Sequence, residues 1–169
     1  DIVAEWVADE PEYRDHIRNK TYDGSLTSEA KKKEKDEKGI YEMYYEFQES
    51  LKAVASHRVL ALNRGEKEDV LKVAVLPPEE RILDYLHRNT GSAGEKTGIL
   101  HAAVEDGYKR LIKPSVEREI RNELTEKAEE QAIDVFSKNL RSLLLQPPLQ
   151  GKTVLGIDAA YRTGRKLAV

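Results

Sequence analysis

A four-residue step of apolar positions runs through the second half of the chain. Its members are Ile112, Val116, Ile120, Leu124, Ala128, Ala132, Phe136 and Leu140. Because a helix places residues i and i+4 on the same face, this row predicts a continuous apolar stripe along one helix. Pro114 lies in the expected first turn, where a helix tolerates proline. The pattern therefore predicts one long helix over about residues 114–145, along which other helices can pack.

Shorter periodic segments precede this helix and predict the elements that pack on it. Short amphipathic helices are expected over residues 1–8, 12–19, 56–64, 79–88 and 99–112. Gly65 is the expected left-handed stop of the third of these helices. The β-branched run 70–76, which ends at Pro77, is the one interior strand candidate.

Two segments between residues 27 and 47 leave alternatives open. The lysine- and acid-rich run 30–38 is typical of a solvated helix with ion pairs, and a phosphate-contacting patch is the alternative. The aromatic residues of segment 40–47 favour a buried helix end over a base-stacking surface, because glutamates flank them. Both segments are therefore expected to be helical.

The last residues read as a β-hairpin, with strands over 153–158 and 165–169 and a turn that contains Gly164. The fold class expected from the whole pattern is mainly α. It is a helical scaffold built round the long helix 114–145, with one short interior strand near 70–76 and this C-terminal hairpin. The chain starts without methionine and stops inside a strand-like run, which predicts a piece of a longer protein.

Composition narrows the class of protein. The net charge of −3 argues against a dedicated cationic nucleic-acid binder, although a local basic face remains compatible with it. The absence of cysteine excludes disulfides and thiolate metal sites and favours a cytoplasmic setting. No apolar stretch approaches the ~18 residues that a membrane span needs, so no membrane partner is expected.

Candidate nucleic-acid contacts lie near the ends of the helix 56–64. Arg58, Arg64 and Lys67 place cations where phosphates could bind. The alternative is that these arginines pair with nearby acids such as Glu66 and Glu68, because surface ion pairs are common.

Other motifs predict no cofactor and no metal. The glycine-rich segment 91–98 and the tripeptide 151–153 lack the spacing and context of a phosphate loop. None of the four histidines forms H-E-x-x-H, and His101 with Glu105 offers only two ligands on one helix face.

Asp158 ends the first predicted hairpin strand. A carboxylate on a rigid strand end is where two-metal phosphodiester enzymes place their first metal ligand. Such a site needs further carboxylates from other elements, and these would have to lie beyond Val169. This chain is therefore not expected to be catalytic by itself.

Taken in order, several segments resemble the Tex family of bacterial transcription accessory proteins. The resemblance lies in 56–66 (SHRVLALNRGE), the helix 114–145 with 139–145 (NLRSLLL), the pair Pro147-Pro148, and 154–169. It implies a multidomain cytoplasmic protein that binds nucleic acid and affects transcription. Residues 1–150 would be its central helical domain and 151–169 the truncated start of an RNase H-like domain of the YqgF type. An OB-fold RNA-binding domain would lie elsewhere in the protein.

The resemblance also implies a role for Asp158, as a vestigial first acid of the RNase H-like fold. Ala159 stands where the family usually has proline, and Arg165 where cysteine is common. Both differences argue against catalysis.

The resulting hypothesis is a non-catalytic helical scaffold that positions nucleic-acid-binding domains. It would contact RNA or DNA through Arg58, Arg64, Lys67 and Arg162, with the transcription machinery as a further partner. One alternative is a metal-dependent nuclease that uses Asp158 in the full-length protein. Another is a protein-interaction platform that docks on the transcription machinery through an acidic helix face made of Glu126, Glu129 and Glu130.

Overall fold

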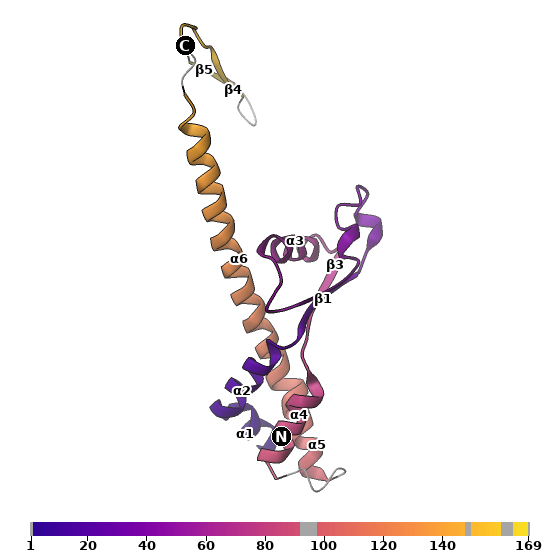
Figure 1. Ribbon diagram of the computed structural model, residues 1–169. Coiled ribbons are helices and arrows are strands. Elements are labelled where there is room, and N and C mark those ends of the chain that lie inside the picture. Colours follow the sequence, from indigo (N-terminus) through magenta and orange to yellow (C-terminus); the bar gives the residue numbers. More distant parts are fainter. Residues whose placement is uncertain (1, 92–97, 148–149, 160–163, 169) are drawn as a thin grey trace. The chain divides into compact units, whose positions relative to one another are not determined.

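The computed structural model describes residues 2–91, 98–147, 150–159 and 164–168 (Figure 1). The chain divides into two compact units, Asp1–Asp134 and Val135–Val169. Helices and two small antiparallel sheets make up the described part, so the mainly α fold expected from the sequence is confirmed.

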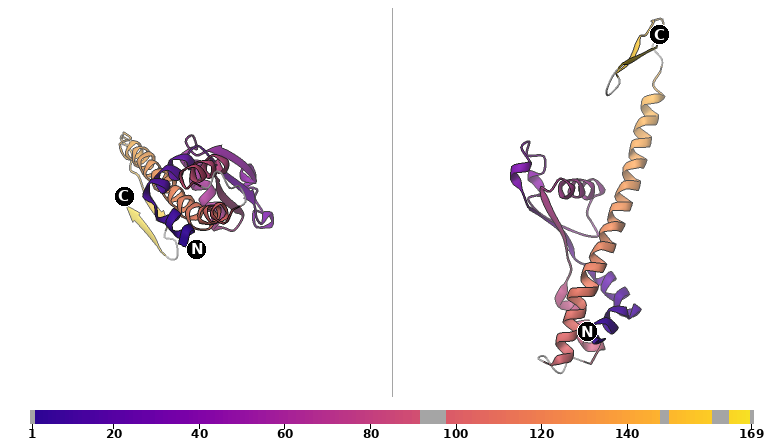
Figure 2. Two further views of the ribbon diagram at one scale, coloured as in Figure 1. Left: turned by 90° about the horizontal axis from the view of Figure 1, so that it is seen from below. Right: turned by 180° about the vertical axis from the view of Figure 1, so that it is seen from behind.

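Five helical segments of the first unit gather around the start of the long helix α6 (Lys113–Leu144). They are α1 (Ile2–Asp9), α2 (Pro11–Thr21), α4 (Glu79–Asn89), α5 (Ile99–Asp106) and the π-helical segment η4 (Gly107–Ile112). In Figures 1 and 2, α1 and α2, drawn in indigo, lie beside the first turns of α6. Arg18 of α2 pairs with Glu119 of α6 at 2.8 Å and also with Glu123. Helix α2 is therefore tied to α6 by charge as well as by burial.

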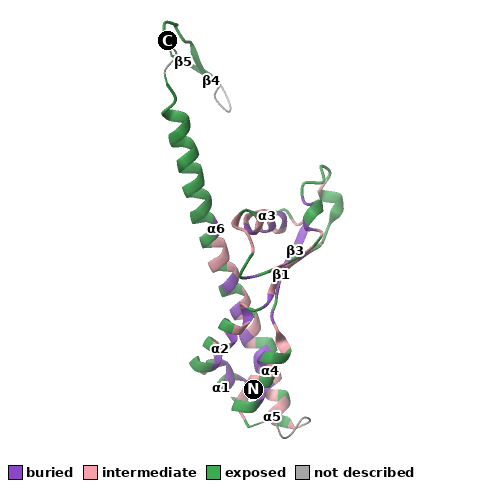
Figure 3. Ribbon diagram, in the orientation of Figure 1, coloured by how far each residue is buried: buried purple, intermediate pink, exposed green. Residues whose placement is uncertain are grey.

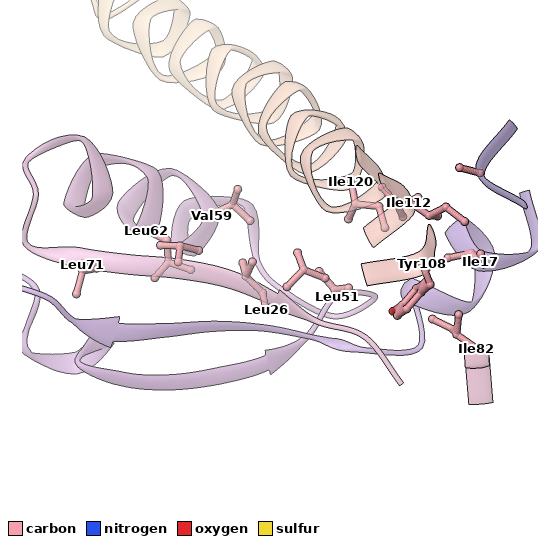
Figure 4. Close-up of a cluster of buried hydrophobic side chains, with 14 of the residues drawn as sticks. Ile17, Leu26, Leu51, Val59, Leu62, Leu71, Ile82, Tyr108, Ile112 and Ile120 are labelled. Carbon is pink, nitrogen blue, oxygen red and sulfur yellow. The ribbon is translucent and has the colours of Figure 1, made fainter. Parts of the chain in front are cut away.

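A three-stranded antiparallel sheet completes the first unit. Its strands are β1 (Ser25–Ala30), β2 (Glu46–Ser50) and β3 (Leu71–Leu76), in the order β2-β1-β3. In the register of the sheet, Thr27 lies opposite Gln48 on one side and Ala74 on the other. Helix α3 (Ser56–Lys67) lies beside β3, and its Val59 and Leu62 are buried with Leu71 (Figure 4).

The strand predicted near 70–76 is confirmed as β3, whereas the helix predicted for the run 30–38 is wrong. Residues 25–30 form β1, and only a 3-10 turn follows, η1 (Lys33–Lys35). Leu26 and Ser28 are buried, while Ser25, Thr27 and Glu29 are more exposed, which is the two-residue period of a strand. Pairing with β3 and β2 supplies the backbone hydrogen bonds, and the local charge pattern could not reveal those partners.

The aromatic segment 40–47 is buried in part. Tyr41 and Tyr44 are buried around a single 3-10 turn, η2 (Glu42–Tyr44), whereas Ile40 and Met43 are exposed. Phe47 belongs to β2, which the sequence analysis did not predict. The expected helix is therefore wrong, although burial of two of the tyrosines is confirmed.

Gly65 does not end α3 as predicted. It lies inside the helix, where an added Cβ would sit 2.6 Å from Cδ1 of Leu71. Glycine is needed there because β3 approaches the helix closely. The left-handed residue is Asp69, with φ of 62°, a conformation that aspartate adopts more readily than most residues.

The apolar stripe of α6 is buried over only part of its length. Val116, Ile120 and Ala128 are buried, whereas Phe136 and Leu140 are exposed (Figure 3). The predicted helix is confirmed with bounds shifted by one residue. The core therefore packs against α6 only as far as Ala128.

The second unit contains the predicted hairpin. Strand β4 (Gly156–Ala159) pairs antiparallel with β5 (Arg165–Ala168), and Ile157 lies opposite Leu167. All side chains described in these two strands are exposed.

Replacing Tyr108 with phenylalanine is expected to leave the free energy of unfolding unchanged or to raise it by about 1 kcal/mol. Tyr108 lies in η4 with 1% of its surface exposed, and its hydroxyl has no hydrogen-bond partner among the described residues. Burial raises the pKa of this hydroxyl. Denaturant unfolding of both proteins measures the effect.

Tyr41→Phe is the matched control, because the Tyr41 hydroxyl donates to Glu68 at 2.9 Å. This substitution is expected to cost about 1 kcal/mol, the net worth of a typical hydrogen bond. A loss of stability in Tyr108→Phe as large as in the control would contradict the prediction and indicate an unseen partner for Tyr108.

Candidate nucleic-acid interface

Helix α3 presents a cationic outer face. Its buried residues are Val59, Leu62 and Gly65. Arg64 and Lys67 are exposed, and a spacing of three residues makes them neighbours on the helix surface. The structure therefore places two of the predicted contact residues side by side.

Arg58 lies on another side of α3, toward the sheet. Its Nη1 donates to Oε2 of Glu49 at 2.9 Å, and its guanidinium carbon lies 6.0 Å from the ring centroid of Phe47. The charge of Arg58 is thus compensated by Glu49, a different acid from those considered in the sequence analysis. This ion pair lowers the net positive charge that Arg58 offers to a phosphate.

The acids nearest to Arg64 and Lys67 in the sequence have other partners. Glu66 pairs with Arg121 of α6, and Glu68 accepts the hydrogen bond from Tyr41. Among the described residues, no carboxylate oxygen lies within 4 Å of the basic nitrogens of Arg64 or Lys67. Their charges are therefore available to an anion.

A second group of cations meets at the end of α3. The ammonium groups of Lys31, Lys32 and Lys35 lie 2.7, 2.6 and 2.8 Å from the carboxylate of Asp69. These three lysines hold the pKa of Asp69 well below its usual range. Asp69 alone cannot neutralise three ammonium groups. Glu66 also raises the pKa of Lys31, but Glu66 is itself paired with Arg121, so positive charge remains in excess at this point.

We call these five cations the α3 basic edge: Lys31, Lys32, Lys35, Arg64 and Lys67. The sequence analysis found its last two members and treated the lysines as part of a helix with balanced charge. Asp69 lies more than 30 positions from the three lysines, so only the pairing of β1 with β3 brings them together.

The remaining predicted residues lie elsewhere. Arg162 falls outside the described residues. Asp158 is exposed in β4, opposite Lys166 of β5, and it is the one acidic residue between Leu145 and Val169. Glu126, Glu129 and Glu130 are all exposed on α6. The hairpin unit therefore holds a single carboxylate, too few for a two-metal site.

A match to a known protein family covers most of the chain. Residues 1–136, which contain α3, the sheet and the first part of α6, match the family described as Tex central region-like. The chain belongs to the Tex family.

Related proteins of the Tex family come from bacteria and animals. The chain is 56% identical over 172 residues to the protein YdcI of Bacillus subtilis, covering 99% of this chain and 24% of that protein. It is 34% identical to S1 RNA-binding domain-containing protein 1 of Homo sapiens, covering 99% and 18%. It is 32% identical to transcriptional accessory protein Tex of Neisseria gonorrhoeae, covering 99% and 23%. The chain thus spans a quarter or less of the length of these Tex-family relatives.

No helix among the described residues has the length and apolar character required to cross a membrane.

Proposed function

We propose that this chain is a non-catalytic scaffold of a cytoplasmic Tex-family protein, and that it contacts RNA or DNA through the α3 basic edge. The excess positive charge at that edge is the observation that carries the proposal. Three lysines share Asp69, and Arg64 and Lys67 have no carboxylate partner among the described residues. Phosphate groups supply the missing negative charge.

The names of two relatives support this proposal. One relative is named for an S1 RNA-binding domain and another as a transcriptional accessory protein. In the proposed arrangement, residues 1–150 form the central helical domain and residues 151–169 begin an RNase H-like domain of the YqgF type. Nucleic-acid recognition by the longer protein would then rest mainly on domains outside this chain.

The exposed apolar residues of α6 support the scaffold role. They are Ile133, Val135, Phe136, Leu140, Leu143 and Leu144. Extended apolar surfaces usually mark contacts with other protein parts. A helix that is buried at one end and apolar but exposed at the other is suited to joining one domain to the next.

The charge-reversal variant Arg64→Glu/Lys67→Glu is expected to weaken binding of single-stranded RNA and to reduce its salt dependence. Each lost phosphate contact lowers the slope of log affinity against log salt by about 0.7 for a single strand, so two contacts remove roughly 1.4. The measurement is a fluorescence-anisotropy titration with labelled single- and double-stranded RNA and DNA at several salt concentrations.

Arg81→Glu/Arg88→Glu is the matched control. It makes the same change of charge at two exposed positions on α4, which lies apart from α3 in Figure 1. We expect this control to retain most of the affinity. Equal losses of affinity in the two double variants would show that net charge alone explains the effect. Absence of binding by the unmodified chain at low salt would refute the proposed contact with nucleic acid.

A further inference from the structure

Helices α4 and α5 bring two imidazoles and a carboxylate together outside the α3 basic edge. The rings of His87 and His101 are stacked, with centroids 3.8 Å apart and planes 13° from parallel. Nδ1 of His101 lies 3.7 Å from Oε1 of Glu105, one helical turn further along α5. One ligand atom from each of the three residues lies within 4.8 Å of the other two.

The three residues of this cluster differ in their exposure to solvent. His87 is 8% exposed, whereas His101 and Glu105 are partly open to solvent. The second oxygen of Glu105, Oε2, accepts from Lys109 at 2.8 Å, so Lys109 holds the carboxylate in place while Oε1 faces the histidines. The donor set is two imidazole nitrogens and one carboxylate oxygen, contributed by two different helices.

We propose that His87, His101 and Glu105 bind a zinc ion. Two histidines and one glutamate are an established zinc ligand set, with water in the fourth position of a tetrahedral site. Imidazole nitrogens also favour zinc over magnesium and calcium, which prefer oxygen ligands alone. Bound zinc would link α4 to α5 and hold the two helices together.

Binding requires a local adjustment of the cluster. Stacked rings direct their nitrogens along parallel lines, so at least one ring must turn for both to face one ion. Ligand atoms of a tetrahedral zinc lie about 3.3 Å apart, given zinc–nitrogen distances of about 2.0 Å. The three ligand atoms therefore have to close in by up to about 1.5 Å, and the proposal requires rotation of the side chains to supply this movement.

The sequence analysis predicted no metal site because it paired only His101 with Glu105. His87 lies 14 positions before His101 and on another helix, so the spacing alone gave no sign of a third ligand. The packing of α4 against α5 supplies it.

A zinc titration of the 169-residue chain, prepared without a polyhistidine tag, tests the proposal. Isothermal titration calorimetry is expected to show one zinc per chain with micromolar or tighter affinity. At a free zinc concentration of about 100 times Kd, the melting temperature is expected to rise by roughly 5–10 °C. Cobalt in place of zinc is expected to give the visible absorption bands of tetrahedral Co²⁺.

His101→Ala and Glu105→Gln remove one ligand each and are expected to weaken zinc binding by at least about 10- to 100-fold, the range seen even for indirect supporting residues. The matched controls are His57→Ala and Glu126→Gln, which change the same residue types at exposed positions on α3 and α6. Circular dichroism verifies that each variant folds, and Glu105→Gln is the variant that alters packing least.

Two results would overturn the proposal. One is the absence of saturable binding of a single zinc by the unmodified chain. The other is an equal loss of affinity in His57→Ala and His101→Ala, which would indicate adventitious binding by surface histidines.

Discussion

Replacing Ile120 with alanine is expected to lower the free energy of unfolding by about 2–5 kcal/mol. Ile120 lies on α6 with no exposed surface, within the core that Ile17, Tyr108 and Ile112 share (Figure 4). The substitution removes buried methyl groups and leaves a cavity, and both effects destabilise the folded state. Urea unfolding followed by circular dichroism measures the difference.

Ile133→Ala is the control for this prediction, because it makes the same chemical change on the same helix. Ile133 is 65% exposed, so its truncation is expected to change stability by less than about 0.5 kcal/mol. Equal effects of the two substitutions would mean that the apolar stripe of α6 is buried alike at both places. That result would contradict a core that ends near Ala128.

Replacing Gly24 with alanine is expected to cost about 3 kcal/mol, at the upper end of the range for forced overpacking. A Cβ at this position would lie 2.2 Å from the carbonyl oxygen of Leu76 and 3.0 Å from Cα of Pro77. These are backbone atoms, which cannot move aside as a side chain can. The carbonyl of Gly24 also accepts from the N–H of Leu51 at 3.1 Å, so its own backbone is held in place.

The Gly91→Ala variant is the control, because it measures the conformational cost of replacing a glycine in the absence of a steric clash. Gly91 has φ of 74°, and a Cβ there would meet no described atom within 4 Å. Its substitution is expected to cost about 1 kcal/mol, the conformational penalty for a left-handed alanine. Thermal or urea unfolding of both variants makes the comparison. If Gly24→Ala cost no more than Gly91→Ala, the close approach between the α2–β1 turn and the end of β3 would be disproved.

Features that depend on residues close together in the chain could be predicted from the sequence, whereas features that depend on distant residues could not. The helix 114–145 was predicted nearly to the residue because its signal repeats every four positions within one element. β3 was predicted because its β-branched run ends at Pro77. β1 and β2 were missed because their side chains are polar or charged at most positions, and the evidence for them is their pairing with each other and with β3.

The candidate sites show the same division. Arg64 and Lys67 were selected because they are cations near the end of a predicted helix, whereas the partner of Arg58 is an acid on a neighbouring strand. The three lysines that meet Asp69 depend on the β1–β3 pairing. His87 joins His101 and Glu105 only because α4 packs against α5.

The sequence by itself determined the mainly α class, the long helix, the C-terminal hairpin and the membership of the Tex family. Each of these rests on a periodic pattern or on an ordered series of motifs along the chain. The tertiary structure alone decided where the apolar stripe of α6 leaves the core, which cations lack a carboxylate partner, and which third ligand completes the histidine–glutamate cluster. Those features depend on contacts between residues distant in the chain, and hydrophobic periodicity carries no information about which distant segments will meet.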